Sequence, residues 1–503
     1  MSDNNTSRRG FLGGAAAAGA GLALGGPASL PEADAATKSR RKLRTKRVDV
    51  AVVGGGFAGL TAAYRVMRAG HSVILLEARD RVGGRVFNHE IGDGEISEAG
   101  GTFIGPTQDR IKALGDTMGV GTFPTYDTGE NVYINSGQRS TFSDTGPTGS
   151  APLDPLILPD LATVVANLDE MSKSVPVDAP WTAANAAEYD RQTLDQWVRA
   201  NSSGQERFIK LVRAATRPIF GAEPTEISLL FTLFYIAASG NEQNVGTFER
   251  NFNTREGAQQ DRFVGGSQVV ATKVARALGR RVILKSPVRQ VRNGARGVSI
   301  VSDRINVRAK QVIVAVPPVL AGRIDYAPDL PPERDSLHQR IPQGTLGKVA
   351  LLYDKPFWRE KGLTGQALHT DGPVSATFDD SPPDGSPGVL FGFVGGDAHR
   401  SFFPLPADQR RAAVIQEMVE CFGSEAANPK EYFETNWPAE RWSRGGPVGL
   451  AGPGVYTAVG PALRKPIGRI HWAGTETSTF WNGYMDGAVR SGERAAREVL
   501  DKL

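Results

Sequence analysis

A short run of apolar, β-branched residues leads directly into a cluster of glycines near the start of this chain. Residues 48–53 (VDVAVV) have the pattern of a buried strand, and residues 54–59 (GGGFAG) follow at once. Residues 60–69 then have the pattern of a helix, residues 72–76 that of a second strand, and Glu77 stands at its end. This order predicts an α/β fold that begins with a Rossmann-like, dinucleotide-binding unit.

Each glycine of this cluster has a separate structural task. Gly54 makes the tight turn, Gly56 lets a pyrophosphate approach the backbone, and Gly59 lets the helix pack closely on the strand. The free amides and the dipole of the helix N-terminus favour the pyrophosphate anion. The Glu77 carboxylate can accept hydrogen bonds from both ribose hydroxyls and would repel a 2′-phosphate.

The residues after Glu77 favour FAD over NAD. Arg79 and residues 81–85 (RVGGR) lie immediately beyond the second strand. Gly84 and its neighbouring glycine allow the backbone to wrap a dinucleotide that extends across the protein, and Arg85 can neutralise phosphate charge. We therefore expect FAD as the cofactor.

The N-terminus has the features of an export signal. Residues 7–12 (SRRGFL) form a twin-arginine pattern, a Gly/Ala-rich apolar run follows, and residues 33–35 (ADA) offer a cleavage site. A membrane anchor is the alternative, but the run is weakly apolar and is broken at Pro27, so we expect no stable membrane insertion. The sequence predicts a signal peptide at 1–35, a basic linker at 36–47, and export by the twin-arginine route to the periplasm or the medium.

Composition excludes several other classes of protein. A chain of 503 residues with 40% hydrophobic residues can form two or more domains. The first 47 residues hold nine Lys/Arg and three Asp/Glu, so of a formal net charge of +4 the remainder is left at −2, and a nucleic-acid partner is not expected. Cys421 is the only cysteine, and the six histidines lack paired metal-ligand spacing, so neither a disulfide nor a metal site is expected.

Several further motifs occur in a fixed order along the chain. They are residues 100–108 (GGTFIGPTQ), 262–267 (RFVGGS), 354–358 (DKPFW), 472–477 (WAGTET) and 481–488 (WNGYMDGA). With these motifs the chain resembles the flavin monoamine oxidase family over nearly all of its length after Val48. The resemblance implies a FAD-binding domain from residues 48–125, 258–318 and 437–503, and a discontinuous α+β substrate-binding domain from residues 126–257 and 319–436. Residues 186–240 have helical patterns within the latter, and residues 229–231 and 233–235 are expected to be core.

The resemblance also implies which residues bind the cofactor. They are Gly54, Gly56, Ala58, Gly59, Glu77, Arg79, Gly84, Arg85, Gly100, Gly101, Thr102, Phe103, Val288, Trp437, Gly474, Glu476 and Met485. Animal members attach FAD to a cysteine, but Pro447 stands at that position here. We therefore expect FAD to be bound noncovalently.

Three residues match catalytic positions of the family. Lys348 matches a lysine that holds a water near flavin N5, and Gln259 matches a glutamine of the substrate cavity. Tyr484 matches one wall of an aromatic cage in front of the flavin, whereas Val448 stands where the second aromatic residue is expected. The resemblance implies hydride transfer from the carbon next to an amine nitrogen to flavin N5, with dioxygen as acceptor and peroxide as product.

Other activities remain open on this scaffold. An L-amino-acid oxidase needs an arginine for the substrate carboxylate, and Arg213, Arg217 and Arg250 lie in the substrate region. A flavin dehydrogenase of a secondary metabolite would pass electrons to a partner other than oxygen, and a binding module would not turn over. Members of the family are often dimers, so a homodimer is expected by analogy.

Overall fold

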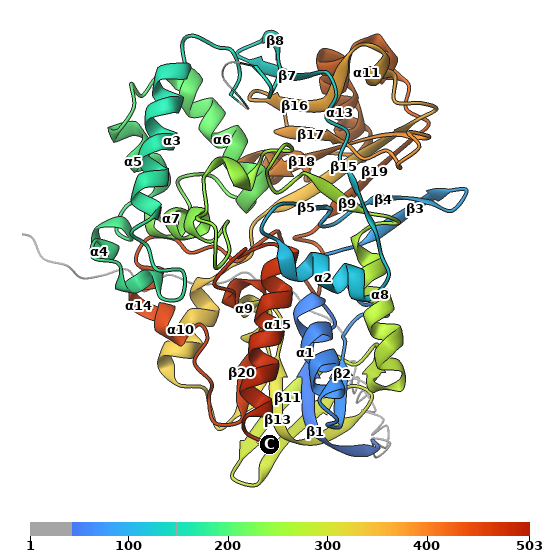
Figure 1. The fold of residues 1–503 in the computed structure, drawn as a ribbon, viewed down its shortest axis with the longest axis vertical. Helices are drawn as coiled ribbons and strands as arrows, with labels where there is room; N and C mark the ends of the chain where they lie inside the picture. Colours follow the sequence, from blue (N-terminus) through green and yellow to red (C-terminus); the bar gives the residue numbers. More distant parts are fainter. Residues whose placement is uncertain (1–42, 147–148, 150) are drawn as a thin grey trace, which may run out of the picture. The chain divides into compact units, whose positions relative to one another are not determined.

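Two large β-sheets organise the part of the chain that the computed structural model describes, residues 43–146, 149 and 151–503 (Figure 1). The predicted signal peptide 1–35 and the predicted linker as far as Lys42 lie outside these residues. Within the described part, no helix has both the length and the apolar character needed to cross a membrane.

The first sheet has eight strands in the order β10-β2-β1-β13-β12-β11-β14, with β20 beside β13. Its strands are β1 (Thr45–Val53), β2 (Val73–Leu76), β10 (Val282–Ile283), β11 (Val288–Gly294), β12 (Gly297–Ser302), β13 (Asn306–Val314), β14 (Asp325–Ala327) and β20 (Ile470–Trp472). The β10-β2-β1-β13-β20 part is parallel. Helices α1 (Phe57–Arg68), α8 (Ser267–Leu278) and α15 (Met485–Leu500) pack on one face of this part. The predicted Rossmann-like α/β class is confirmed.

Strand β1 lies at the centre of this sheet, and the burial of its side chains explains its composition. Val50 and Val52 pack against the helices, while Ala51 and Val53 pack into the core of the opposite face. A parallel strand that is covered on both faces has a continuous apolar sequence, as here. The strand begins at Thr45, so residues 45–47 are not linker as predicted. Their backbone pairs with β13, which extends equally far, and polar side chains are tolerated at this exposed end.

The second sheet has seven strands in the order β19-β15-β18-β17-β16-β7-β8. They are β7 (Glu130–Asn135), β8 (Gln138–Phe142), β15 (Leu346–Tyr353), β16 (Leu363–His369), β17 (Ala376–Asp379), β18 (Gly388–Gly395) and β19 (Glu431–Asn436). All neighbours are antiparallel except β16 and β7. Helix α13 (Ala407–Phe422) packs into the core of this sheet.

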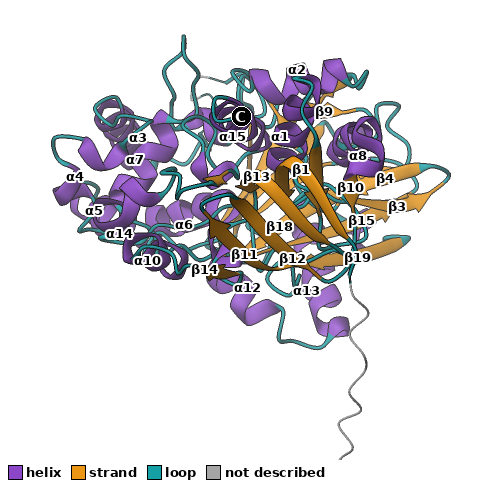
Figure 2. Ribbon diagram, turned by 90° about the horizontal axis from the view of Figure 1, so that it is seen from below, coloured by secondary structure: helices purple, strands orange, loops and turns teal. Residues whose placement is uncertain are grey.

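A group of helices forms a separate core beside the two sheets (Figure 2). It contains α3 (Leu158–Ser172), α4 (Ala186–Tyr189), α5 (Leu194–Ala200), α6 (Glu206–Phe220) and α7 (Leu229–Ala237). The residues of α7 from Leu229 to Ile236 are all buried, because the helix is apolar on every side. The expected core at residues 229–231 and 233–235 is confirmed.

Most strands of each predicted domain lie together in one of the two large sheets. The exception is β14, which lies in the segment assigned to the substrate domain but pairs with β11 of the first sheet. The remaining strands of the described residues form two small sheets, β3 (Asn88–Gly92) with β4 (Glu95–Glu98), and β5 (Phe103–Ile104) with β9 (Asp261–Phe263) and β6 (Thr122–Pro124). The domain boundaries themselves stay predictions.

Candidate active site

A cavity of about 1270 Å³ runs from the loop after β1 to the helices α3, α6 and α7. Its lining includes Gly54 and Val288 at one end, Lys348 from the second sheet, and Leu161 and Phe220 from the helical group. This volume exceeds the roughly 300–1,000 Å³ of an ordinary small-molecule pocket. The cavity therefore has room for a cofactor and a substrate together.

The glycine loop brings three backbone segments into close contact. Gly54 has φ +106°, and a Cβ there would lie 2.7 Å from the carbonyl oxygen of Ala315. A Cβ at Gly59 would lie 2.0 Å from the carbonyl oxygen of Gly54, so this glycine permits α1 to pack on the loop. Gly84 has φ +62° and approaches Gly56, where a Cβ on Gly84 would be 3.2 Å from the Gly56 Cα. Gly54, Gly56 and Gly84 line the cavity, but Gly59 does not, because its task is packing.

The Glu77 carboxylate is buried at the end of β2, where it lines the cavity. Its Oε2 accepts the N–H of Gly55 at 2.6 Å, and its Oε1 accepts the N–H of Arg79 at 2.7 Å. Each oxygen retains a second lone pair. The carboxylate is thus held rigidly by backbone and can accept two further hydrogen bonds, as binding to a ribose requires.

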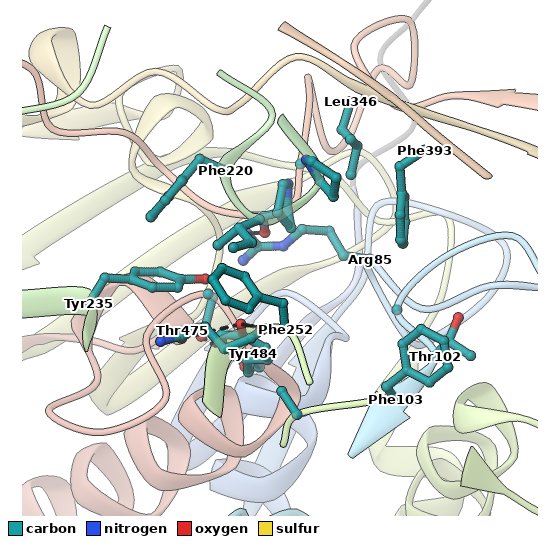
Figure 3. Close-up of a pocket in the computed structure, with 18 of the residues that line it drawn as sticks. Arg85, Thr102, Phe103, Phe220, Tyr235, Phe252, Leu346, Phe393, Thr475 and Tyr484 are labelled. Atoms are coloured by element: carbon teal, nitrogen blue, oxygen red, sulfur yellow. Dashed lines mark hydrogen bonds between the residues drawn. The ribbon is translucent and has the colours of Figure 1, made fainter. Parts of the chain in front are cut away.

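Arg85, in the loop between β2 and β3, places a cation in the lining of the cavity. Its Nη1 and Nη2 lie 2.6 and 3.1 Å from the two carboxylate oxygens of Glu476, and Nη1 also donates to the carbonyl oxygen of Pro447. Gln343 bonds to both partners of this ion pair. Figure 3 shows Arg85 between Phe220 and Tyr235 on one side and Thr102 and Phe103 on the other.

Glu476 is fully enclosed and does not line the cavity, although the sequence predicts direct contact with the cofactor. Burial alone would raise the pKa of this carboxyl, but the charge and hydrogen bonds of Arg85 and the bond from Gln343 lower the pKa overall. Glu476 therefore stays ionised and acts through Arg85, whose orientation it fixes.

The other predicted cofactor residues all line the cavity. They are Ala58, Arg79, Gly100, Gly101, Thr102, Phe103, Val288, Trp437, Gly474 and Met485. Arg79 is held by Ser443, whose Oγ accepts from its Nη2 at 2.8 Å. Met485 is the first residue of α15, so the N-terminus of this 16-residue helix meets the cavity.

Lys348 enters the cavity from β15 and is only 4% exposed. Its Nζ donates to the carbonyl oxygen of Glu98, to Thr102 Oγ1 at 2.7 Å and to the carbonyl oxygen of Gly100 at 3.3 Å. The same nitrogen lies 3.4 Å from the ring centroid of Phe391. Burial lowers the pKa of Lys348 to about 8, although the charges of Asp380 and Glu98 oppose this. Its ammonium form therefore titrates close to neutral pH.

Tyr484 and Gln259 meet at a shared acceptor in the wall of the cavity. The Tyr484 hydroxyl donates to the carbonyl oxygen of Asn251 at 3.0 Å, and Gln259 Nε2 donates to the same oxygen at 3.2 Å. Gln259 Oε1 is buried and has no hydrogen-bond partner among the residues that the structure describes. An unpaired buried acceptor is unfavourable, so this oxygen is ready to accept an N–H group from a ligand.

A second tyrosine ring beside Tyr484 comes from α7, which the sequence assigned to the core alone. Val448 is fully buried and does not line the cavity. Tyr235 does line it, and its ring centroid lies 5.8 Å from that of Tyr484 and 4.7 Å from that of Phe220. Tyr235 reaches this place over Gly483, where an added Cβ would lie 2.4 Å from the Tyr235 hydroxyl and 3.1 Å from Val448 Cβ. Small residues at 448 and 483 thus leave space for Tyr235, a signal that only the folded chain displays.

The described residues fit FAD well. The Glu77 carboxylate, the glycine cradle and the Arg85 guanidinium all line one cavity, and they suit the ribose and the pyrophosphate of a dinucleotide. Pro447 lines the cavity at the position where animal relatives have cysteine, while Cys421, the only cysteine of the chain, is buried in the core of the second sheet.

Comparison with known proteins agrees with this site. The profile of the family described as "Flavin containing amine oxidoreductase" matches residues 57–500. A protein of Mycobacterium tuberculosis named as a flavin-containing monoamine oxidase is 43% identical over 91% of this chain and 97% of its own length. An L-amino acid dehydrogenase of Synechocystis is 34% identical over 90% of this chain and 95% of its own.

Solved structures give the same result. Putrescine oxidase bound to putrescine superposes with a TM-score of 0.85 at 32% identity, over 91% of this chain and 100% of the other. Cyclohexylamine oxidase from Brevibacterium oxydans also gives 0.85, at 33% identity over 90% and 99%. The chain therefore belongs to the family of flavin-containing amine oxidoreductases, and FAD is its cofactor.

Proposed function

We propose that this protein oxidises apolar amines that carry no carboxylate, with noncovalently bound FAD and with dioxygen as the acceptor. The observation that carries this proposal is the unpaired Gln259 Oε1, which lies in a largely apolar cavity that also holds the predicted FAD residues. The overall reaction converts a primary amine, oxygen and water into an aldehyde, ammonia and hydrogen peroxide. Bound FAD supplies the redox chemistry, because it takes two electrons and a proton from the carbon next to the nitrogen and passes them to oxygen.

The amine nitrogen is oriented by the polar residues that face the aromatic side chains. Gln259 Oε1 accepts one N–H of a neutral amine, while the rings of Tyr484 and Tyr235 flank the path of the amine. Burial raises the pKa of both tyrosines, so their hydroxyls stay protonated. The rings exclude water from the reacting carbon and hold the apolar part of the substrate.

The rest of the substrate space is apolar. Helices α3 and α6 contribute Leu161, Val165, Leu211, Val212 and Ile219 to the lining. Such a surface gains binding free energy from hydrocarbon groups, at about 25 cal/mol for each Å² removed from water. We therefore expect amines with bulky apolar substituents to bind more tightly than short polar ones.

An L-amino acid dehydrogenase is the second candidate, because the Synechocystis relative carries that name. That activity needs a cation for the substrate carboxylate. Arg213 pairs with Glu206, Arg217 pairs with Glu223, and Arg250 donates to the carbonyl oxygen of Val245; none of the three lines the cavity. Arg255 does line it, but Asp127 and Asp144 hold its guanidinium. These pairings favour an amine without a carboxylate over an L-amino acid as the substrate.

Export and assembly form part of the proposal. The twin-arginine pattern supports transport of the folded holoprotein out of the cytoplasm to the periplasm or the medium, followed by cleavage near residue 35. N-terminal sequencing of secreted protein tests this step. A homodimer, expected from the family, is tested by light scattering of the purified protein.

A peroxide-coupled screen of the purified holoprotein tests the activity. The panel contains primary and secondary apolar amines, diamines and L-amino acids, and anaerobic bleaching of the flavin absorbance is followed in parallel. We expect peroxide and bleaching with apolar amines. Bleaching without peroxide would show that the electron acceptor is not oxygen. Activity confined to L-amino acids would overturn the proposed substrate class.

A further inference from the structure

Lys348 is accompanied by three buried charged side chains that the proposed function does not use. Glu98 ends β4, Arg262 lies in β9 and Asp380 follows β17 directly. All three are at most 3% exposed. They come from segments far apart in the sequence and meet beside β15, next to the small sheets that contain β4 and β9 (Figure 1).

Glu98 is the member that connects this cluster to Lys348. Its carbonyl oxygen accepts from Lys348 Nζ, and its Oε2 lies 3.5 Å from Arg262 Nε. Arg262 Nη2 lies 2.7 Å from Asp380 Oδ1. The backbone N–H of Glu98 donates in turn to Asp380 Oδ2 at 3.0 Å. The charges of all three groups therefore act on the pKa of Lys348.

The surroundings of the Glu98 carboxyl bring its protonation close to neutral pH. Its Oε1 accepts the N–H of Ser267 at 2.7 Å, whereas its Oε2 is buried and receives no hydrogen bond from the described part of the chain. Burial and the neighbouring Asp380 raise the pKa of Glu98 to about 7, against the attraction of Arg262. With both carboxyls ionised, the two carboxylates balance Arg262 and the Lys348 ammonium.

We propose that Glu98 is a positioning residue for the reaction, because its ionised carboxylate and that of Asp380, against the charge of Arg262, keep Lys348 as an ammonium group in the cavity near neutral pH. The inference rests on the proposed function of Lys348. The charged groups that face Lys348 are Glu98 from β4, Asp380 after β17 and Arg262 from β9, while β18 contributes the uncharged rings of Phe391 and Phe393. The two carboxylates stabilise the ammonium form, and Arg262 opposes it.

Two isosteric variants of the holoenzyme test this inference. Glu98→Gln and Asp380→Asn each remove one negative charge and keep the side-chain size. Glu417→Gln is the matched control, since Glu417 is also buried but lies beside His369, away from the cavity. Two quantities are measured against pH: the flavin absorbance of the oxidised holoenzyme without substrate, and the rate at which the reduced enzyme reacts with oxygen.

The wild type is expected to show a transition near pH 8 in both quantities. In Glu98→Gln and Asp380→Asn the transition moves to lower pH by about one unit, because removal of a nearby negative charge lowers the pKa of a lysine. Glu98→Asp, which restores the charge, keeps the transition near its wild-type position, and so does Glu417→Gln.

Each outcome separates this inference from the proposed role of Lys348. Lys348→Met removes the transition if Lys348 is the titrating group, and persistence of the transition in that variant overturns the role of Lys348 itself. A transition that Lys348→Met abolishes but the two isosteric variants leave in place overturns the inference alone. A wild-type absorbance that does not titrate between about pH 6 and 10 also overturns it. If one isosteric variant fails to fold, the other carries the test.

Discussion

Lys348 places a titratable cation in the lining of the cavity. Replacement by methionine keeps the length of the side chain and removes the charge. We expect Lys348→Met to slow the reaction of the reduced enzyme with oxygen by about a hundredfold, the effect of losing one preorganised electrostatic contact, with a smaller effect on reduction by amine. Stopped-flow absorbance measures the two half-reactions separately. Lys355→Met, at an exposed site, is the control, and equal slowing of both half-reactions would contradict the role.

Glu476 illustrates a residue that acts on the cofactor through another side chain. Glu476→Gln removes the charge that holds the Arg85 guanidinium at 2.6 and 3.1 Å. Because Arg85 then loses its fixed orientation, we expect the dissociation constant of FAD to rise about tenfold, which corresponds to about 1.4 kcal/mol. Titration of apoprotein with FAD, followed by flavin fluorescence, measures this change. Glu493→Gln, which breaks an ion pair with the more exposed Arg65, should leave FAD affinity unchanged. An unaltered affinity in Glu476→Gln would remove its role in binding.

At the scale of an element, helices α1 and α15 pack in close contact beside the glycine loop. A Cβ at Gly492 of α15 would lie 2.3 Å from the carbonyl oxygen of Ala58, in the first turn of α1. We therefore expect Gly492→Ala to separate the two helices and to destabilise the protein by about 1–3 kcal/mol, as overpacking does. Thermal unfolding of the holoprotein measures the loss. Gly121→Ala, where an added Cβ meets no atom within 4 Å, should have no such effect. Equal unfolding temperatures would show that α15 shifts without loss of stability.

Elements with a strong local signal could be predicted from the sequence. The strand at residues 72–76 is observed as Val73–Leu76, and the helix predicted at residues 60–69 is observed as Phe57–Arg68. The helix starts earlier because Gly56 already serves as its N-cap. Residues 45–47 carry no apolar pattern and join β1 only because β13 lies beside them, so their strand could not be predicted from local composition.

Assembly of the cavity belongs to the scale of the whole molecule. Single motifs predicted Gly54, Glu77 and Arg85, because the chemistry of a dinucleotide requires these residue types at fixed spacing. The contact of Lys348 with Glu98 spans 250 positions in the sequence, and Tyr235 reaches Tyr484 from another helix. Contacts of this kind depend on how the two sheets and the helical group pack, which no local pattern specifies.

A buried histidine makes the stability of the whole molecule sensitive to acid. His338 lies in α10 (Pro332–Arg340), where its Nε2 accepts from Arg334 Nε at 2.9 Å, and its ring meets that of Trp472 edge-on at 5.5 Å. Burial, and then the charge of Arg334, lower the pKa of His338 to about 3 from an ordinary value of 6.5. Between these two pH values the unfolded chain therefore binds a proton at His338, whereas the folded chain does not. The stabilising contribution of the neutral ring is complete above pH 6.5 and is lost as the pH falls toward 3, by up to about 1.4 kcal/mol per pH unit.

His338→Gln removes this titration while an amide oxygen can still accept from Arg334. Acidification from about pH 6.5 to about pH 5 lowers the free energy of unfolding of both proteins. We expect this loss to be about 2 kcal/mol smaller in the variant than in the wild type. Urea unfolding at a series of pH values measures the two slopes. His71→Gln, at a side chain that is 37% exposed, is the control and should retain the wild-type slope. If His338→Gln also retains the wild-type slope, the acid sensitivity arises from other groups. The packing of α10 against β20 then does not depend on a neutral ring at this position.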